Sequence, residues 1–316
     1  MIFGDQEREV FVRLMRKQAI FAGIRVLAYC VMGNHFHMLI EVPRRPADGI
    51  GDRELLERSA AVYSASVVAR FRRKLEGSQD CEEQKDNLRA CLLRRMWDVS
   101  RFIQELKQRF SLWYNRLNGR VGTLWEERFR SVLVGAEGPA LARIAAYIDL
   151  NPVRAGIVDD PQNYRWSSIS EAVAGRECAV SGYRRLVQIV DGRERSSAEA
   201  LESYRTWLYA RGGESAGSME NSVPGRRRNI DPKRVRAVLE GRGRLSLAES
   251  LMCRLRFFSE GVAIGTRAFV EGLIPSPMLP TGSGTAREPF EISHIEGPSM
   301  FLFRPLRRVP IECEAP

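Results

Sequence analysis

Two of the three histidines in this 316-residue chain lie two positions apart, in the segment 32–40, Met-Gly-Asn-His-Phe-His-Met-Leu-Ile. The residues that follow them are apolar and β-prone, and the side chains of a strand alternate between its two faces. His35 and His37 are therefore predicted to point one way and Phe36 the other. Two imidazoles on one face supply part of a metal site or a paired acid and base. The alternative is two half-exposed strand histidines without a ligand.

A tyrosine and an asparagine, Tyr147 and Asn151, lie four residues apart later in the chain. They fall on a predicted helix that ends near Pro152, because the residue before a proline is excluded from the α region. At roughly 100° per residue, Tyr147 lies about 110° from the centre of the apolar stripe, so it is not expected in the core. Asn151, one turn later, can converge with it. The alternative is a tyrosine that flanks the core. The stripe consists of Leu141, Ile144, Ala145 and Ile148.

These residue types are suited to phosphoryl transfer. A phenol with a pKa of about 10 is a poor nucleophile at neutral pH and needs help from its site. A divalent ion held by the two histidines and an amide oxygen would polarise the scissile phosphate and neutralise its growing charge. Neutral imidazoles suit transition ions and tolerate Mg²⁺ or Mn²⁺ when oxygen ligands complete the shell. Attack by the tyrosine would leave a phosphotyrosine and a free 3′ hydroxyl.

The composition favours a polyanionic partner. Lys and Arg number 49 against 39 Asp and Glu, which gives a net charge of +10. Cations that neutralise phosphates release counterions, although many basic proteins are merely soluble. The six cysteines show no paired spacing, the amino terminus is charged at once, and no apolar run approaches the ~18 residues of a membrane span. We therefore expect a cytoplasmic monomer or homodimer with no membrane partner.

Hydrophobic periodicity and turn residues predict the elements that position these side chains. Helices are expected over 6–22, 54–73, 85–94 and 99–117, a hairpin over 24–32 and 35–42, a strand over 128–134 and the tyrosine helix up to about 150. We predict a catalytic domain over 1–172 with a helical insertion at 47–95. A helical and linker region over 173–230, a small helical unit over 231–273 and a largely irregular tail over 274–316 would follow.

Four segments in order, 28–37, 122–129, 147–156 and 164–168, resemble the REP-associated tyrosine transposases. The resemblance covers about residues 5–172. It implies an α+β fold with a ferredoxin-like sheet carrying helices on one face, and cleavage and strand transfer of single-stranded DNA at hairpins or palindromic repeats. It also implies that Tyr147 is the nucleophile and that His35, His37 and Asn151 hold the divalent ion.

One departure from the family and one set of arginines complete these expectations. Family members usually begin with a strand before the first helix, whereas this chain starts at that helix, so the first strand is apparently missing. A start placed too far downstream and a decayed copy both account for this. The rival function is therefore a non-enzymatic nucleic-acid-binding protein of the same fold. The candidates for phosphate contact, with a solvated charged face as the alternative, are Arg128, Arg130 and Arg154.

Overall fold

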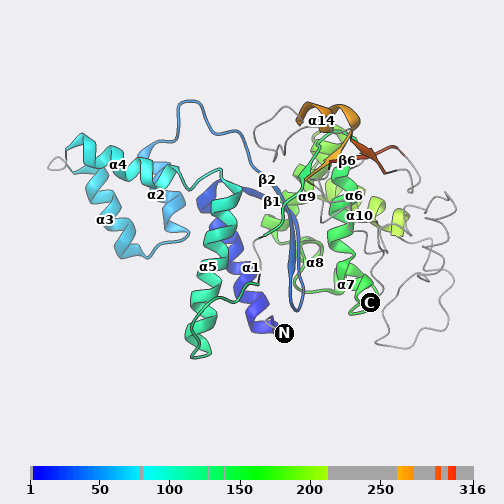
Figure 1. Cartoon of the computed structure of the whole chain (residues 1–316), viewed down its shortest axis with the longest axis horizontal. Coiled ribbons are helices and arrows are strands. Elements are labelled where there is room, and N and C mark those ends of the chain that lie inside the picture. Colours follow the sequence, from blue (N-terminus) through cyan, green and yellow to red (C-terminus); the bar gives the residue numbers. More distant parts are fainter. Residues whose placement is uncertain are drawn as a thin grey trace, which may run out of the picture. The chain divides into compact units, whose positions relative to one another are not determined.

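The computed structural model describes residues 3–77, 81–126, 129–138, 140–212, 262–273, 289–292 and 298–303. These residues form a mixed α+β protein, which confirms the predicted class. The chain divides into two compact units (Figure 1). The first contains residues 1–26, 31–36 and 40–129, and the second contains residues 27–30, 37–39 and 130–316. In the described part of the chain, no helix is both long enough and apolar enough to span a bilayer.

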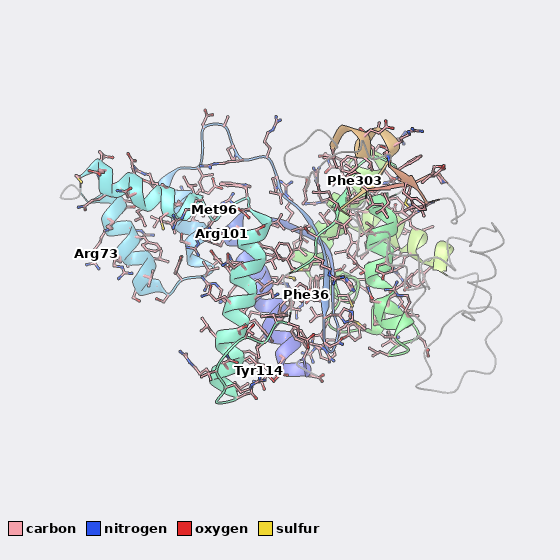
Figure 2. All side chains as sticks on the ribbon, in the orientation of Figure 1. Phe36, Arg73, Met96, Arg101, Tyr114 and Phe303 are labelled. Atoms are coloured by element: carbon pink, nitrogen blue, oxygen red, sulfur yellow. The ribbon has the colours of Figure 1, made fainter. Side chains whose placement is uncertain are left out.

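The first unit is built on two long helices, α1 (Asp5–Ala22) and α5 (Val99–Leu117), which pack against each other. Both match their predicted ranges within one residue. Asp98 caps α5 by accepting a hydrogen bond from the Arg101 backbone N–H at 2.9 Å, which satisfies one of the unpaired donors at a helix start. Aromatic side chains fill the core of this region, with ring centroids 4.7–6.4 Å apart. They are Phe3, Phe11, Phe36, Phe110 and Trp125. Figure 2 labels one of them, Phe36.

The insertion folds as three helices, α2 (Asp52–Ala60), α3 (Ala65–Glu76) and α4 (Glu82–Leu93). The helix predicted over 54–73 is thus two helices, because Ser64 takes an extended conformation that interrupts the hydrogen-bond ladder. The three helices share a core with the end of α1, formed by Phe21, Leu55, Leu56, Leu75, Leu92 and Met96. The insertion therefore belongs to the first compact unit.

Strands β1 (Arg25–Val31) and β2 (Phe36–Glu41) form the predicted hairpin. The Met32 N–H donates to the His35 carbonyl at 2.8 Å, which closes the turn at Gly33 and Asn34. The middle of the hairpin, residues 27–30 and 37–39, belongs to the second unit, whereas its two ends belong to the first.

The second unit combines helices with a small sheet. Its helical elements are α6 (Ala140–Asp149), α7 (Asn151–Arg154), the 3₁₀ turn η1 (Pro161–Asn163), α8 (Ser168–Val173), α9 (Glu177–Asp191), α10 (Ser197–Gly212) and α14 (Arg267–Leu273). Its strands are β3 (Leu133–Val134), β4 (Ala263–Gly265), β5 (Phe290–Glu291) and β6 (Phe301–Phe303), in the order β3-β4-β6-β5. The β3–β4 pair is parallel and the other two pairs are antiparallel.

A ferredoxin-like sheet is not confirmed, since the described strands form two separate sheets. The strand expected over 128–134 is reduced to Leu133–Val134, and it pairs with β4. In the described part of the small helical unit predicted over 231–273, helix α14 is preceded by strand β4, which pairs with strands on both sides. Likewise, β5 and β6 lie in the tail expected to be largely irregular.

The predicted domain limits differ from the compact units, because the proposed domain 1–172 contains parts of both. The region 173–230 is helical as far as residue 212, and the predicted linker beyond it lies outside the described residues. The cysteines that the structure describes are free thiols: Cys30, Cys81, Cys91 and Cys178.

Candidate active site

The helix of the tyrosine ends just before Pro152, as predicted, and a separate helical turn follows it. Helix α6 stops at Asp149, and α7 begins at Asn151 with the proline in its first turn. Proline has no N–H, so it cannot bond to the carbonyl of Ile148, four residues earlier. The Asn151 side-chain amide replaces that donor, giving 3.2 Å to the Ile148 carbonyl and 3.1 Å to the Tyr147 carbonyl. The Asn-Pro pair thus joins α6 to the short helix α7, which carries Arg154 close to the tyrosine.

Tyr147 is a buried side chain with 4% of its surface exposed, so the expectation that it lies outside the core is wrong. Every residue of α6 is buried, because contacts cover the helix on all sides rather than on one stripe. The Arg154 guanidinium lies 3.7 Å from the centre of the Tyr147 ring. The imidazole of His37 meets the same ring edge-on, with centroids 6.2 Å apart.

Arg154 links the tyrosine to the asparagine. Its Nη2 donates to Asn151 Oδ1 at 2.5 Å while its guanidinium covers the phenol ring. Arg154 is itself only 8% exposed, and Asn151 only 7%. The structure therefore brings together three residues singled out from one ten-residue motif, and adds His37 from the hairpin. Tyr147, Asn151 and Arg154 are buried and His37 is half-buried, and the cluster carries one permanent positive charge.

The arrangement fits a metal ion only in part. His35 Nδ1 donates to Asn34 Oδ1 at 2.6 Å, so the neutral ring carries its lone pair on Nε2, as in many metal-binding histidines. Asn151 does not fit as the third ligand, because its oxygen accepts from Arg154. A divalent ion on that oxygen would lie about 4 Å from the guanidinium, a repulsion of roughly 8 kcal/mol at an effective dielectric constant of 20.

The histidines belong to different compact units, His35 to the first and His37 to the second. Among the described residues, no three His, Cys, Asp or Glu side chains are grouped so that they could hold a metal ion. Of the other two arginines, Arg130 is exposed and Arg128 lies outside the described residues. Their contact with phosphate stays a prediction.

A buried carboxylate beside this cluster was missed by the sequence analysis. Asp149 is fully buried and accepts hydrogen bonds from the hydroxyls of Tyr183, at 2.9 Å, and Tyr204. Ser168 joins the network through Tyr183 at 2.8 Å. Burial raises the pKa of Asp149 to about 7 even though these hydroxyls favour its ionised form. Burial and the neighbouring carboxylate also raise the pKa of both tyrosines, so their hydroxyls keep their protons and donate.

This network connects several elements to the helix of the tyrosine. Ser168 Oγ accepts from the Tyr29 N–H at 2.8 Å and donates to the Tyr29 carbonyl at 3.2 Å. Asp149 therefore holds α6 to α9 and α10, and through Ser168 to β1. Its tyrosine partners lie 34 and 55 residues away along the chain, so no local motif indicated them.

Comparisons with protein-family models, with curated proteins and with solved structures found no match.

Proposed function

We propose that this protein cleaves single-stranded DNA and transfers the strand through a covalent bond to Tyr147. The observation that carries the proposal is the convergence of the buried Tyr147, Asn151 and Arg154 with the half-buried His37 in one cluster. The residue types were expected from chemistry alone, and the family resemblance assigns the nucleophile to the same tyrosine. A nucleophile, a cation for the phosphate and an imidazole are the groups that such a reaction needs.

In the proposed step, the phenol oxygen of Tyr147 forms a bond to phosphorus and the bond from phosphorus to the 3′ oxygen breaks. The phenol proton passes to water, and the leaving 3′ oxygen takes up a proton. Arg154 would neutralise charge on the phosphate oxygens, since a guanidinium can donate two hydrogen bonds to them. The phosphotyrosine conserves the bond energy, so a second 3′ hydroxyl can rejoin the strand without an external energy source.

The buried state of the cluster sets a condition on binding. With Tyr147 only 4% exposed, a phosphate can reach the phenol only if the Arg154 side chain moves from the ring. The phosphate would then replace both the ring and the Asn151 oxygen as partner of the guanidinium. A bidentate, charge-assisted contact between a guanidinium and a phosphate is stronger than a neutral hydrogen bond. This difference favours the exchange of the Asn151 oxygen for the phosphate.

Three finer points remain part of the proposal because the family resemblance alone carries them. The substrate would be a hairpin or palindromic repeat, the strands would belong to a ferredoxin-like sheet, and Mg²⁺ or Mn²⁺ would be held by His35 and His37. When bound, such an ion would polarise the scissile phosphate. The net charge of +10 supports the nucleic-acid partner.

The burial of Tyr147 also favours a second function, the binding of nucleic acid without cleavage. A tyrosine packed under an arginine and beside a histidine is a satisfied core residue if no phosphate ever displaces the arginine. The basic surface would then bind DNA through its phosphates alone.

Substitution of the nucleophile separates the two functions. Tyr147→Phe removes only the hydroxyl, so binding of labelled single-stranded hairpin DNA should survive while cleavage and the covalent adduct disappear. Tyr114→Phe, on α5, is the matched control and should retain both activities. Mass spectrometry of trapped adducts should identify a DNA-linked peptide containing Tyr147. Cleavage by Tyr147→Phe would refute the covalent mechanism, and binding without cleavage by the unmodified chain would favour the second function.

A further inference from the structure

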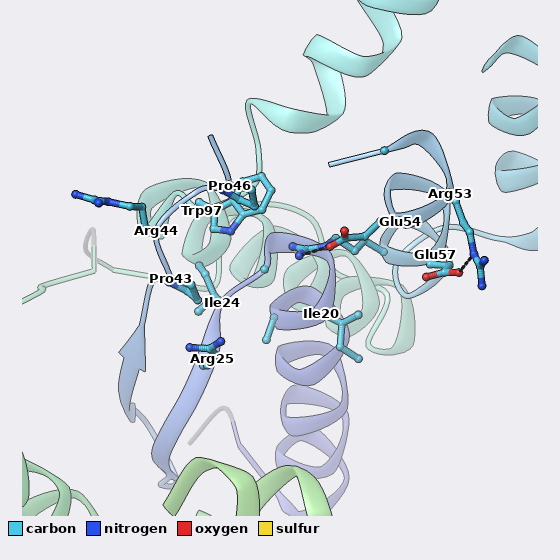
Figure 3. A pocket seen from close by; sticks show the side chains of 14 residues that line it. Ile20, Ile24, Arg25, Pro43, Arg44, Pro46, Arg53, Glu54, Glu57 and Trp97 are labelled. Atoms are coloured by element: carbon cyan, nitrogen blue, oxygen red, sulfur yellow. Dashed lines mark hydrogen bonds and ion pairs between the residues drawn. The ribbon is translucent and has the colours of Figure 1, made fainter. Parts of the chain in front are cut away.

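The first unit contains a groove, remote in sequence from Tyr147, that the proposed chemistry does not use. It has a volume of about 1020 Å³ and is lined by the end of α1, the start of β1, the segment after β2, the start of α2 and Trp97 (Figure 3). This volume lies at the upper end of the ~300–1,000 Å³ typical of ligand pockets. The insertion, whose role the sequence left open, therefore supplies one wall of the groove.

The groove combines positive charge with apolar surface. Of the four arginines that line it, Arg25 is paired with Glu41 at 3.1 Å and two others with lining glutamates, so Arg44 is the lining arginine without a carboxylate partner in the described residues. Each glutamate is paired with an arginine of α2, Glu57 with Arg53 at 3.0 Å and Glu54 with Arg58 at 2.6 Å. The apolar part of the lining comes mainly from Ile20, Ile24, Pro43, Pro46 and Trp97. A ligand that offers both a negative charge and a flat apolar face matches this lining.

The two arginines that follow β2 are available for an anion. Arg44 and Arg45 are exposed, and neither has an ion-pair partner within the described residues. Arg44 extends outward from the segment at Pro43 (Figure 3). The Arg45 guanidinium lies 5.7 Å from the Trp97 ring, so positive charge stands next to the indole.

Trp97 has a backbone conformation that residues other than glycine rarely adopt. It has a φ of 55°, and no other non-glycine residue in the described part of the chain has a positive φ. Its N–H donates to the Ala22 carbonyl at 2.7 Å, which fixes the residue at the end of α1. Backbone strain of this kind concentrates at ligand sites, where the surrounding structure maintains it.

Arg58, which is paired with Glu54, also lies against the indole of Trp97. Its guanidinium lies 5.0 Å from the Trp97 ring, and its buried Nη1 has no hydrogen-bond partner among the described residues. Gly23, with φ of 66°, permits this packing, since a Cβ at that position would overlap the guanidinium.

We propose that this groove binds a single-stranded segment of DNA, with a base against Trp97 and the adjoining phosphates on Arg44 and Arg45. Stacking on an aromatic ring together with arginine contacts to the backbone is how single strands are bound without sequence preference. The proposal rests on the proposed function for the choice of DNA. It adds a second contact, formed with the insertion, that would hold flanking strand rather than the cleaved phosphate.

A binding assay in EDTA tests the arginines without requiring cleavage. The affinity of the full chain for fluorescent oligo(dT) is measured by anisotropy over a range of salt concentrations. Arg44→Gln/Arg45→Gln should weaken binding roughly tenfold at 0.1 M salt and reduce the slope of log affinity against log salt by about 1.4. Arg13→Gln/Arg70→Gln removes the same charge from exposed arginines outside the groove and should leave both values unchanged. Equal effects of the two pairs would overturn the proposal.

Photocrosslinking tests the base contact without altering Trp97, whose substitution risks the fold. Irradiation with oligonucleotides that carry 5-iododeoxyuridine should yield a DNA-linked peptide containing Trp97. Crosslinks found only at other aromatic residues would refute the stacking role. If thymidine 5′-phosphate saturates the groove at the same concentration as the oligonucleotide, the groove is a mononucleotide site instead. If an acidic peptide displaces the oligonucleotide and thymidine 5′-phosphate does not, the groove binds a protein partner. Absence of a Tyr147 adduct leaves all these readouts unaffected, so the two proposals can fail separately.

Discussion

Replacement of the buried carboxylate by its amide, Asp149→Asn, should remove most of the pH dependence of the stability of the second unit between pH 4 and 7. Asp149 is fully buried among the hydroxyls of Tyr183, Tyr204 and Ser168. A pKa of about 7, against the ordinary 3.8 of an aspartate, corresponds to about 4 kcal/mol of unfolding free energy.

The sign follows from proton binding. Between pH 4 and 7 the folded chain keeps the proton on Asp149, whereas the unfolded chain has lost it. The free energy of unfolding therefore falls as the pH rises through this range and is constant above about pH 7. The amide introduced by Asp149→Asn would carry no charge at any pH, so the substituted chain should lack this decline. That amide can accept from one tyrosine hydroxyl and donate to another, which preserves the shape of the network.

Hydrogen exchange is the suitable assay, because a chain of two compact units need not unfold in a single step. Exchange of peptides from α6 and α9 is compared between the two proteins at the same pH, so that the intrinsic exchange rates cancel. The opening free energy of the Asp149→Asn chain minus that of the unmodified chain should increase by up to about 4 kcal/mol between pH 4 and pH 7. Titration of other groups is common to both proteins and cancels as well. A difference that stays constant with pH would refute this reasoning.

Three further results would test the site. Arg154→Gln should slow cleavage by about 10²–10³, as loss of a transition-state donor does, whereas Arg176→Gln, at an exposed arginine, should not. His35→Ala or His37→Ala should reduce metal-dependent cleavage by orders of magnitude with little change in hairpin binding, and His294→Ala serves as control; full activity in excess EDTA would contradict this. The affinity for single-stranded DNA should fall with salt by roughly 0.7 logarithmic units per phosphate contact, and a flat response would count against phosphate binding.

The elements with strong periodicity could be predicted from sequence. Helices α1 and α5 and the hairpin were found within two residues of their ends, because apolar spacing and the Gly33-Asn34 turn are local signals. The division of the expected 54–73 helix, and the short strand β4, depend on packing with partners distant in sequence. No local pattern records those partners.

The candidate site could likewise be predicted only where its contacts are local in the sequence. Tyr147 and Asn151 were brought together correctly, since four residues make about one helical turn. The burial of Tyr147 was missed because a single apolar stripe cannot reveal that Arg154 and His37 cover the remaining side. Asp149 was missed for a related reason: its partners are tyrosines, which alone suggest ordinary core packing.

Phe36, the hydrophobic residue between the two histidines, packs against Phe11 and Trp125. Its ring centroid lies 4.7 Å from that of Phe11 and 5.9 Å from that of Trp125. Because the side-chain period of a strand is two, a slip of one residue would exchange this ring for an imidazole inside the aromatic cluster. Burial of an imidazole among rings that offer no acceptor would oppose that slip. Phe36 therefore fixes the register of the strand. A large apolar side chain at position 36 determines which way the neighbouring imidazoles face, without touching a substrate. Substitutions of Phe36 should be tolerated according to the volume of the new side chain and not according to its reactivity.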